Sequence, residues 1–291
     1  MLKAGYAGLG IMGRPMALNL TKAGFSLAVY SRRKASAEEL ITAGAEFAET
    51  PAALAALVDV LFINVSDTPD VEDVLFGSEG VVHGAKKGLV VVDMGTTSPS
   101  ATREFAARLL ESGVDLLDAP VSGGEVGAIN GTLTIMAGGG QVAFDRAKPM
   151  FEAMGKTITH VGAVGAGQVA KACNQIVVGG TIVAVAEALL FAEKQGVDGA
   201  KVREALLGGF AQSKILEVHG QRILDDNFKP GFKTKLHQKD MRIVLEEALN
   251  KQVALPGAAQ VLQYLNALMG MGEGELDSSA IFHVLSKMSK S

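Results

Sequence analysis

A glycine-rich run near the start of the chain has the spacing Gly-x-Gly-x-x-Gly. It comprises Gly8, Leu9, Gly10, Ile11, Met12 and Gly13, and it follows a short apolar segment at residues 2–7. Between a strand and a helix, such a run makes a tight turn, admits the pyrophosphate of a dinucleotide and lets helix and strand pack closely. A chain with 35 glycines also produces this spacing by chance. The apolar segment before it and the helical pattern after it, from Pro15 to Gly24, favour dinucleotide binding over a glycine-rich turn.

The end of the second expected strand, residues 26–30, indicates which dinucleotide binds. NAD sites carry Asp or Glu about 20 residues after the fingerprint, whereas this chain has Ser31, Arg32, Arg33 and Lys34 there. A guanidinium donates paired hydrogen bonds to the oxygens of a ribose 2′-phosphate. We therefore expect NADP(H) to be preferred, with NAD(H) possible, and we assign the phosphate to Arg32, beside Ser31. The alternative is a solvated charge run, which is our interpretation of Lys34.

Two later stretches have residues suited to catalysis. Ser122, Gly123 and Gly124 follow an expected strand, and their hydroxyl and backbone N–H groups suit a substrate carboxylate. A glycine turn capped by Ser122 is the alternative. Lys171 lies one turn inside an otherwise apolar helix, with Asn174 on the same face. Burial lowers the pKa of a lysine towards the range useful for proton transfer, although lysines at helix starts are usually surface residues.

The elements that must position these residues change in type along the chain. Strands are expected at residues 60–65, 89–93, 115–118, 132–137 and 157–161, separated by helices. Two of the helix starts are expected at Thr50-Pro51 and Ser98-Pro99. This alternation predicts a mostly parallel sheet covered on both faces. After about residue 163 only helices are expected, at residues 167–195, 200–207, 214–224, 236–249, 257–268 and 278–288. The predicted domains are therefore residues 1–162, doubly wound α/β, and residues 163–291, all-helical.

Composition excludes several classes of protein. The 291 residues carry a net charge of −4 with mixed signs and no extended basic stripe, so nucleic acid is not an expected partner. No signal peptide is expected, because the N-terminus enters a strand and the fingerprint at once, and no apolar run of membrane-spanning length is expected either. Cys173 is the single cysteine, which excludes an intrachain disulfide and favours a cytoplasmic protein. We expect it to be a small core residue.

The expected helix at residues 167–195 is apolar nearly all round, so it must be covered on most sides. Its own domain and a second copy of the chain are the expected covers. The prediction is a homodimer or a homotetramer. No His, Asp and Glu cluster has metal-ligand spacing, so no metal is expected.

Ordered motifs along the whole chain carry a resemblance. They are Gly8–Gly13 with Pro15-Met16-Ala17, the segment Asp93 to Pro99, the segment Asp118 to Gly124, Gly165-x-Gly167-x-x-x-Lys171-x-x-Asn174, and Phe232-x-x-x-Leu236-x-x-Lys239-Asp240. With them the chain resembles, end to end, the β-hydroxyacid dehydrogenase family, which includes 3-hydroxyisobutyrate dehydrogenases, tartronate semialdehyde reductases and glyoxylate/succinic semialdehyde reductases. The resemblance implies an α/β Rossmann-type doubly wound N-terminal domain and an all-α C-terminal domain, with the active site between them.

The resemblance also implies roles for individual residues. By matching motif, Lys171 would be the general acid/base, Ser122, Gly123 and Asn174 would hold the substrate, and Thr96 would contact the nicotinamide ribose. Lys239 would reach the cofactor, and Phe232 and Asp240 would close the site, while His237 is expected to pack or orient its neighbours. In NADP-using members the second strand commonly ends Asn-Arg-Ser/Thr, and this chain keeps only the arginine, as Arg32.

The expected activity is NADPH-dependent reduction of a small aldehyde that carries a carboxylate. The segments around residues 208–213, 227–232 and 236–240 resemble tartronate semialdehyde reductases most closely, which implies conversion of tartronate semialdehyde to D-glycerate. Glyoxylate/succinic semialdehyde reductase is the runner-up, and 3-hydroxyisobutyrate dehydrogenase is a further alternative. Two alternatives from another class are a non-catalytic NADP(H)-binding module and a scaffold that assembles through the long helix.

Overall fold

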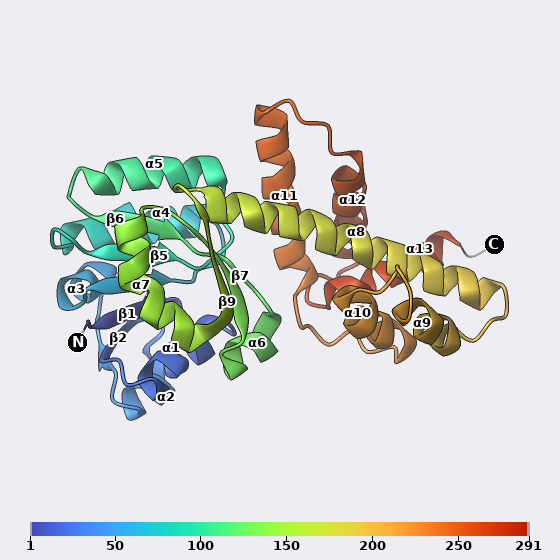
Figure 1. Ribbon diagram of the computed structural model, residues 1–291, viewed down its shortest axis with the longest axis horizontal. Helices are drawn as coiled ribbons and strands as arrows, with labels where there is room; N and C mark the ends of the chain where they lie inside the picture. The colour runs from blue at the N-terminus through green and yellow to red at the C-terminus, as the bar shows by residue number, and fades with distance from the viewer. Residues whose placement is uncertain (1, 290–291) are drawn as a thin grey trace. The chain divides into compact units, whose positions relative to one another are not determined.

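A mostly parallel sheet forms the centre of the N-terminal part of the chain (Figure 1). In the computed structural model, which describes residues 2–289, it has nine strands in the order β3-β2-β1-β4-β5-β6-β8-β7, with β9 beside β8. The strands are β1 (Ala4–Ala7), β2 (Leu27–Tyr30), β3 (Glu46–Phe47), β4 (Val60–Ile63), β5 (Val90–Asp93), β6 (Asp115–Asp118), β7 (Val121–Ser122), β8 (Leu133–Gly138) and β9 (Gly155–Gly162). Strands β1 to β6 pair in parallel, whereas β8 is antiparallel to β6 and β7.

Helices cover both faces of this sheet, because successive strand residues point to opposite sides. In β4, Val60 and Phe62 lie in one core with α1 (Gly13–Lys22), α2 (Glu38–Thr42) and α7 (Gln141–Met154). Leu61 and Ile63 lie in the other core, with α3 (Pro51–Leu57), α4 (Thr68–Phe76) and α5 (Pro99–Leu110). The short helix α6 (Gly124–Asn130) packs beside α1. This two-sided cover confirms the predicted doubly wound fold.

Side-chain caps mark the helix starts that the sequence predicts. Thr50 accepts a hydrogen bond from the N–H of Ala53 at the start of α3, and Ser98 accepts one from Ala101 at the start of α5. In both helices proline follows the cap, at a position where its missing N–H has no cost. These caps fix the helices that follow β3 and β5.

The second part of the chain is helical. Its elements are α8 (Ala166–Lys194), α9 (Gly199–Leu207), α10 (Lys214–Leu224), α11 (Thr234–Asn250), α12 (Pro256–Gly270), the short turn η3 (Ser278–Ala280) and α13 (Ile281–Met288). They enclose one apolar core, to which α8 contributes the fully buried Ile182 and Ala186. The chain forms two compact units, which divide between Lys171 and Ala172, inside α8. The domain boundary expected after residue 162 stays a prediction.

Helix α8 differs from one sequence expectation. Within residues 2–289 it is the one helix that could cross a membrane by length and mean hydropathy, whereas no such segment was expected. Its apolar side chains, including Leu189 and Leu190, pack into the core of the helical unit. Helix α8 is therefore a core helix and not a membrane span.

Three further expectations need correction. Strands β3 and β7 were not predicted, because two-residue strands carry no alternating pattern. The helix expected at residues 278–288 begins with the separate turn η3. Cys173 is exposed and not a core residue. It lies two residues after the buried Lys171 and two before the buried Gln175, and this spacing turns it to the opposite side of the helix.

Candidate active site

The predicted site residues of the first unit follow the carboxyl ends of its parallel strands. From β1 the chain builds β2 and β3 on one side and then crosses to β4, β5 and β6 on the other, so the strand order reverses between β1 and β4. Doubly wound folds bind ligands outside the carboxyl ends of the strands at such a point. The glycine run follows β1, Arg32 follows β2, Thr96 follows β5, and Ser122 lies shortly after β6.

The three fingerprint glycines have different surroundings. Gly8 has a φ of +96°, and a Cβ there would lie 2.3 Å from the carbonyl oxygen of Asn64. At Gly13 a Cβ would lie 2.0 Å from the carbonyl oxygen of Gly8, so only glycine lets α1 begin this close to the turn. A Cβ on Gly10 would meet no atom of residues 2–289 within 4 Å. Gly10 therefore leaves open backbone just before α1, and the N-terminus of a helix is a general anion-binding position.

The residues between these glycines are held to different degrees. Leu9 is buried in the core of the sheet, and Met12 packs partly against that core. Ile11 is 51% exposed. Leu9 and Met12 thus anchor the run to the core, while Ile11 stays exposed.

The cations after β2 differ in their contacts. Lys34 lies 4.9 Å from the centre of the Phe47 ring and 3.8 Å from a carboxylate oxygen of Glu49. Arg32 is exposed, and within residues 2–289 its side chain makes no hydrogen bond or ion pair. The charge of Lys34 therefore already interacts with groups of the protein itself, whereas the Arg32 guanidinium is available to an anion.

A buried carboxylate organises the segment after β5. Asp93 accepts hydrogen bonds from the N–H of Gly95, at 2.9 Å, and from the hydroxyl of Thr97, at 2.8 Å. Gly95 and Thr97 are both buried, whereas Thr96 between them is half-buried. The segment thus presents Thr96 at the carboxyl edge of the sheet.

A second buried carboxylate holds the first turn of α8. Asp118, at the end of β6, accepts hydrogen bonds from the N–H groups of Gly165, at 2.7 Å, and Gln168, at 2.8 Å. Burial raises the pKa of Asp118 to about 6, although the two N–H donors act in the opposite direction. Gly167 permits the contact, because a Cβ there would lie 2.3 Å from the carbonyl oxygen of Met136.

Lys171 follows one turn later in α8 and contacts strand β7, which contains Ser122. Its Nζ donates a 2.8 Å hydrogen bond to the carbonyl oxygen of Val121, and its side chain is only 8% exposed. Gly123 and Gly124, which have φ values of +137° and +62°, turn the chain from β7 into α6. Lys171 therefore contacts the residue next to Ser122, in the first unit.

In the helical unit, three predicted site residues are connected through a fourth. Lys239 Nζ lies 2.8 Å from Oδ1 of Asp240, whose Oδ2 accepts a 2.7 Å hydrogen bond from Gln175. Gln175 in turn accepts a 2.8 Å hydrogen bond from Asn174. The sequence analysis missed Gln175. A polar residue four positions after Lys171 on an apolar helix was the available signal.

Phe232 precedes α11 and is fixed by a residue that the sequence analysis also missed. Asp277 accepts hydrogen bonds from the N–H groups of Gly231, at 2.9 Å, and Phe232, at 3.0 Å. Burial alone would raise the pKa of Asp277. Hydrogen bonds to its carboxylate, among them those from the His219 ring and the Phe232 N–H, hold that pKa well below its usual range. The Phe232 ring lies 5.6 Å from the ring of the fully buried His237.

Comparisons with known proteins agree with this architecture. Residues 3–162 match the NAD binding domain of 6-phosphogluconate dehydrogenase, and residues 165–285 match the NAD-binding domain of NADP-dependent 3-hydroxyisobutyrate dehydrogenase. The chain belongs to the 6-phosphogluconate/3-hydroxyisobutyrate dehydrogenase family. It is an oxidoreductase that acts on CH–OH groups, and it carries NAD(P)-binding domains.

Individual members of this family are similar over nearly the whole chain. The 2-hydroxy-3-oxopropionate reductase of Escherichia coli (strain K12) is 49% identical over 287 residues, which are 99% of this chain and 98% of that protein. The crystal structure of 3-hydroxyisobutyrate dehydrogenase from Salmonella typhimurium has a TM-score of 0.87 at 31% identity and covers 98% of this chain and 100% of its own. The Mycobacterium tuberculosis 3-hydroxyisobutyrate dehydrogenase with L-serine has a TM-score of 0.90 at 29% identity, covering 98% and 99%.

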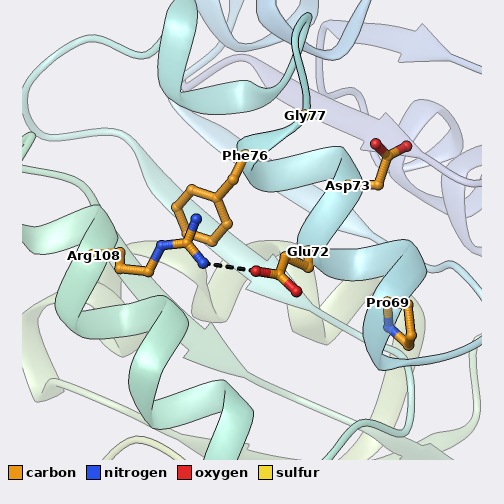
Figure 2. A pocket seen from close by; sticks show the side chains of 6 residues that line it. All are labelled: Pro69, Glu72, Asp73, Phe76, Gly77 and Arg108. Carbon is orange, nitrogen blue, oxygen red and sulfur yellow. Dashed lines mark hydrogen bonds and ion pairs between the residues drawn. The ribbon is translucent and has the colours of Figure 1, made fainter.

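A surface hollow elsewhere in the first unit is unrelated to these family motifs. Figure 2 shows its lining, Pro69, Glu72, Asp73, Phe76, Gly77 and Arg108, which comes from α4, the residue after it, and α5. The Arg108 guanidinium lies 3.6 Å from the centre of the Phe76 ring and 2.8 Å from Glu72. Its charge is thus already paired, and none of the predicted site residues lines the hollow. Within residues 2–289, no group of three or more His, Cys, Asp or Glu residues could hold a metal ion.

Proposed function

We propose that the protein reduces a small aldehyde that carries a carboxylate to the corresponding hydroxy acid, with NADPH as the reductant. The observation that carries this proposal is the Lys171 ammonium at the Val121 carbonyl, next to Ser122, in the unit that contains the dinucleotide fingerprint. The proposed substrate is tartronate semialdehyde and the product D-glycerate. The 49% identity to a 2-hydroxy-3-oxopropionate reductase supports this choice, because that name denotes the same compound.

The proposed chemistry assigns the proton to Lys171. When bound, the nicotinamide supplies a hydride to the aldehyde carbon. The Lys171 ammonium stabilises the negative charge that develops on the carbonyl oxygen and then donates a proton to it, which leaves a neutral amine that solvent reprotonates. The Ser122 hydroxyl and the N–H groups of Gly123 and Gly124 hold the substrate carboxylate. This binding fixes the carbonyl in the orientation that the reaction requires.

The cofactor preference is part of the proposal. Gly10 leaves room for a pyrophosphate, and the uncommitted Arg32 offers its guanidinium to a 2′-phosphate, with Ser31 beside it. NADP(H) is therefore the proposed cofactor, ahead of NAD(H), and Thr96 is proposed to contact the nicotinamide ribose. In the helical unit we propose that Lys239 contacts the cofactor. We propose that Asn174, Phe232 and Asp240 bind the substrate, as the family motifs imply.

A steady-state panel tests the activity. Tartronate semialdehyde, glyoxylate, succinic semialdehyde and 3-hydroxyisobutyrate would each be assayed with NADP(H) and with NAD(H), the last substrate in the oxidising direction. The highest kcat/KM is expected for tartronate semialdehyde with NADPH. A higher value for glyoxylate or succinic semialdehyde would identify that reductase instead, and a higher value for 3-hydroxyisobutyrate would identify a dehydrogenase of that acid. No turnover with any of them would contradict the proposal.

We also propose that the protein works in the cytoplasm as a homodimer or a homotetramer. Helix α8 exposes large apolar side chains besides those it buries, among them Val177, 66% exposed, and Phe191, 68% exposed. A second copy would cover such side chains. Sedimentation at micromolar concentration is expected to show the oligomer, and Val177→Glu is expected to weaken it. Val142→Glu, on α7 and 84% exposed, is the control, and a wild-type profile of monomer alone would contradict the proposal.

A further inference from the structure

The side chain of Gln168 makes a paired contact with the backbone on both sides of Thr96. Its Oε1 accepts a 3.1 Å hydrogen bond from the N–H of Thr97, and its Nε2 donates a 2.9 Å hydrogen bond to the carbonyl oxygen of Gly95. The same Nε2 lies 3.4 Å from Oδ2 of Asp93. The Gln168 amide thus hydrogen-bonds the residue before Thr96 and the residue after it. Gln168 is 1% exposed, so solvent does not substitute for either contact.

The backbone of Gln168 is held as firmly as its side chain. Its N–H donates to the buried Asp118 carboxylate at 2.8 Å, which fixes the first turn of α8 against the end of β6. Lys171 is three residues further along this helix, so its Cα lies about one turn away on a neighbouring position of the same face. Any shift of the first turn of α8 therefore moves the ammonium group that contacts Val121.

We propose that Gln168 is a positioning residue, which keeps the Thr96 segment after β5 and the Lys171 ammonium on α8 at a fixed separation. This inference rests on the role proposed above for Lys171. The residue that is expected to contact the nicotinamide ribose and the residue that is expected to donate the proton are then set by one side chain. Such alignment matters because a misplacement of about 1 Å costs roughly 100-fold in rate.

A neutral side chain of this length with one acceptor and one donor satisfies both backbone groups. A methionine would fill the space but leave the buried Gly95 carbonyl and the Thr97 N–H without their partner. A glutamate would still accept from Thr97, but when ionised it would lose the donor to Gly95 and lie against the carboxylate of Asp93. A protonated glutamate has the hydrogen-bonding pattern of the amide. The charged groups around position 168 are Asp93 on β5, Asp118 on β6, Lys171 on α8 and Arg103 on α5, which lies beside Gly165.

The proposal is tested with Gln168→Met and Gln168→Glu in the full-length protein. In Gln168→Met, kcat for the aldehyde is expected to fall by about 10- to 100-fold while the NADPH Kd changes by less than about threefold. The primary isotope effect on kcat with 4-deuterated NADPH is expected to rise, because a misaligned hydride transfer limits the rate. In Gln168→Glu, the ratio of its kcat to that of the wild type is expected to rise as the pH falls.

Hydrogen exchange gives a readout that does not depend on activity. Exchange at the Thr97 amide is expected to accelerate in Gln168→Met, because the acceptor of that N–H is removed. Thr102→Val is the matched control, since Thr102 is equally buried and touches the Thr97 hydroxyl at 3.3 Å, but from α5 and not from α8. It is expected to keep kcat, the isotope effect and the Thr97 amide exchange close to the wild type.

Several outcomes would overturn the proposal. These are an unchanged kcat and isotope effect in a folded Gln168→Met, unchanged exchange at Thr97, or the same losses in Thr102→Val. If Gln168→Met does not fold, Gln168→Glu decides: a ratio of its kcat to that of the wild type that does not change with pH would also overturn the proposal. A wild type that turns over no aldehyde would contradict the proposed function instead, and the exchange experiment would still decide whether Gln168 holds the Thr96 segment.

Discussion

The Nζ of Lys171 donates a 2.8 Å hydrogen bond to the carbonyl oxygen of Val121, the residue that precedes Ser122. The contact joins the first turns of α8 to strand β7, and Asp118 at the end of β6 accepts hydrogen bonds from the N–H groups of Gly165 and Gln168 at the start of the same helix. A cation is thereby placed beside donors suited to a carboxylate. This position agrees with the proposed role of Lys171 as the proton donor.

Replacement of Lys171 by alanine is expected to lower kcat by about 10²- to 10⁴-fold, the usual contribution of a general acid. NADPH binding is expected to be nearly unchanged, because the glycine run and Arg32, not Lys171, are the groups proposed to hold the pyrophosphate and the 2′-phosphate. Steady-state kinetics and a fluorescence titration with NADPH measure the two quantities. Lys194→Ala, at the exposed end of the same helix, is the control. Near-full turnover of Lys171→Ala across the pH range would show that another group donates the proton.

Arg32→Ala is expected to raise the KM for NADPH by about ten- to a hundredfold, since a charge-assisted hydrogen bond to phosphate contributes roughly 1.5–3 kcal/mol. The KM for NADH should change little, because NADH lacks the 2′-phosphate. Arg33→Ala provides the comparison, as Arg33 is exposed and adjacent. A wild-type kcat/KM for NADH that equals or exceeds that for NADPH would disprove the assignment.

The two glycines Gly10 and Gly13 are expected to respond differently to alanine. At Gly13 the new Cβ would lie 2.0 Å from the Gly8 carbonyl oxygen, and such overpacking costs about 1–3 kcal/mol in the free energy of unfolding. At Gly10 a Cβ meets no atom of the described part of the chain within 4 Å, so stability should be kept while NADPH binding weakens. Denaturant unfolding and NADPH titration of both variants separate the effects. Tight NADPH binding by Gly10→Ala would place the pyrophosphate elsewhere.

The sequence predicted those features that local chemistry determines. Proline after a capping Thr50 or Ser98 fixed the starts of α3 and α5, and the glycine spacing placed the turn after β1. The long helix α8 was predicted to within one residue at each end, because nearly every position in it is apolar or small.

Buried polar contacts between distant segments were beyond sequence analysis. Asp277 and Phe232 meet across 45 residues, and Gln175 and Asp240 across 65, so neither pair leaves a periodic signal. Gln168 lay inside a recognised motif at a position with no assigned role, and only the folded chain shows that its amide brackets Thr96. Cys173 was assigned to the core because no neighbouring cation and histidine marked it as a nucleophile, whereas its position on α8 exposes it.

The raised pKa of Asp118 gives the stability of the protein a specific pH dependence. Burial favours the protonated carboxyl in the folded state and raises its pKa from 3.8 to about 6. The stability that this group contributes is therefore fully present below pH 3.8 and is lost as the pH rises through 6. Over this interval the loss is about 2–3 kcal/mol, at 1.36 kcal/mol per pKa unit.

Asp118→Asn removes this titration while keeping the shape of the side chain. The difference in the free energy of unfolding, wild type minus variant, is therefore expected to decrease as the pH rises from about 4 to about 6.5. A constant offset will accompany it, since asparagine has one acceptor oxygen for the N–H groups of Gly165 and Gln168. Urea unfolding at several pH values measures the difference, with Asp115→Asn as the control at the exposed start of β6. A difference that increased with pH would mean that the N–H donors outweigh burial, and that the Asp118 pKa is lowered.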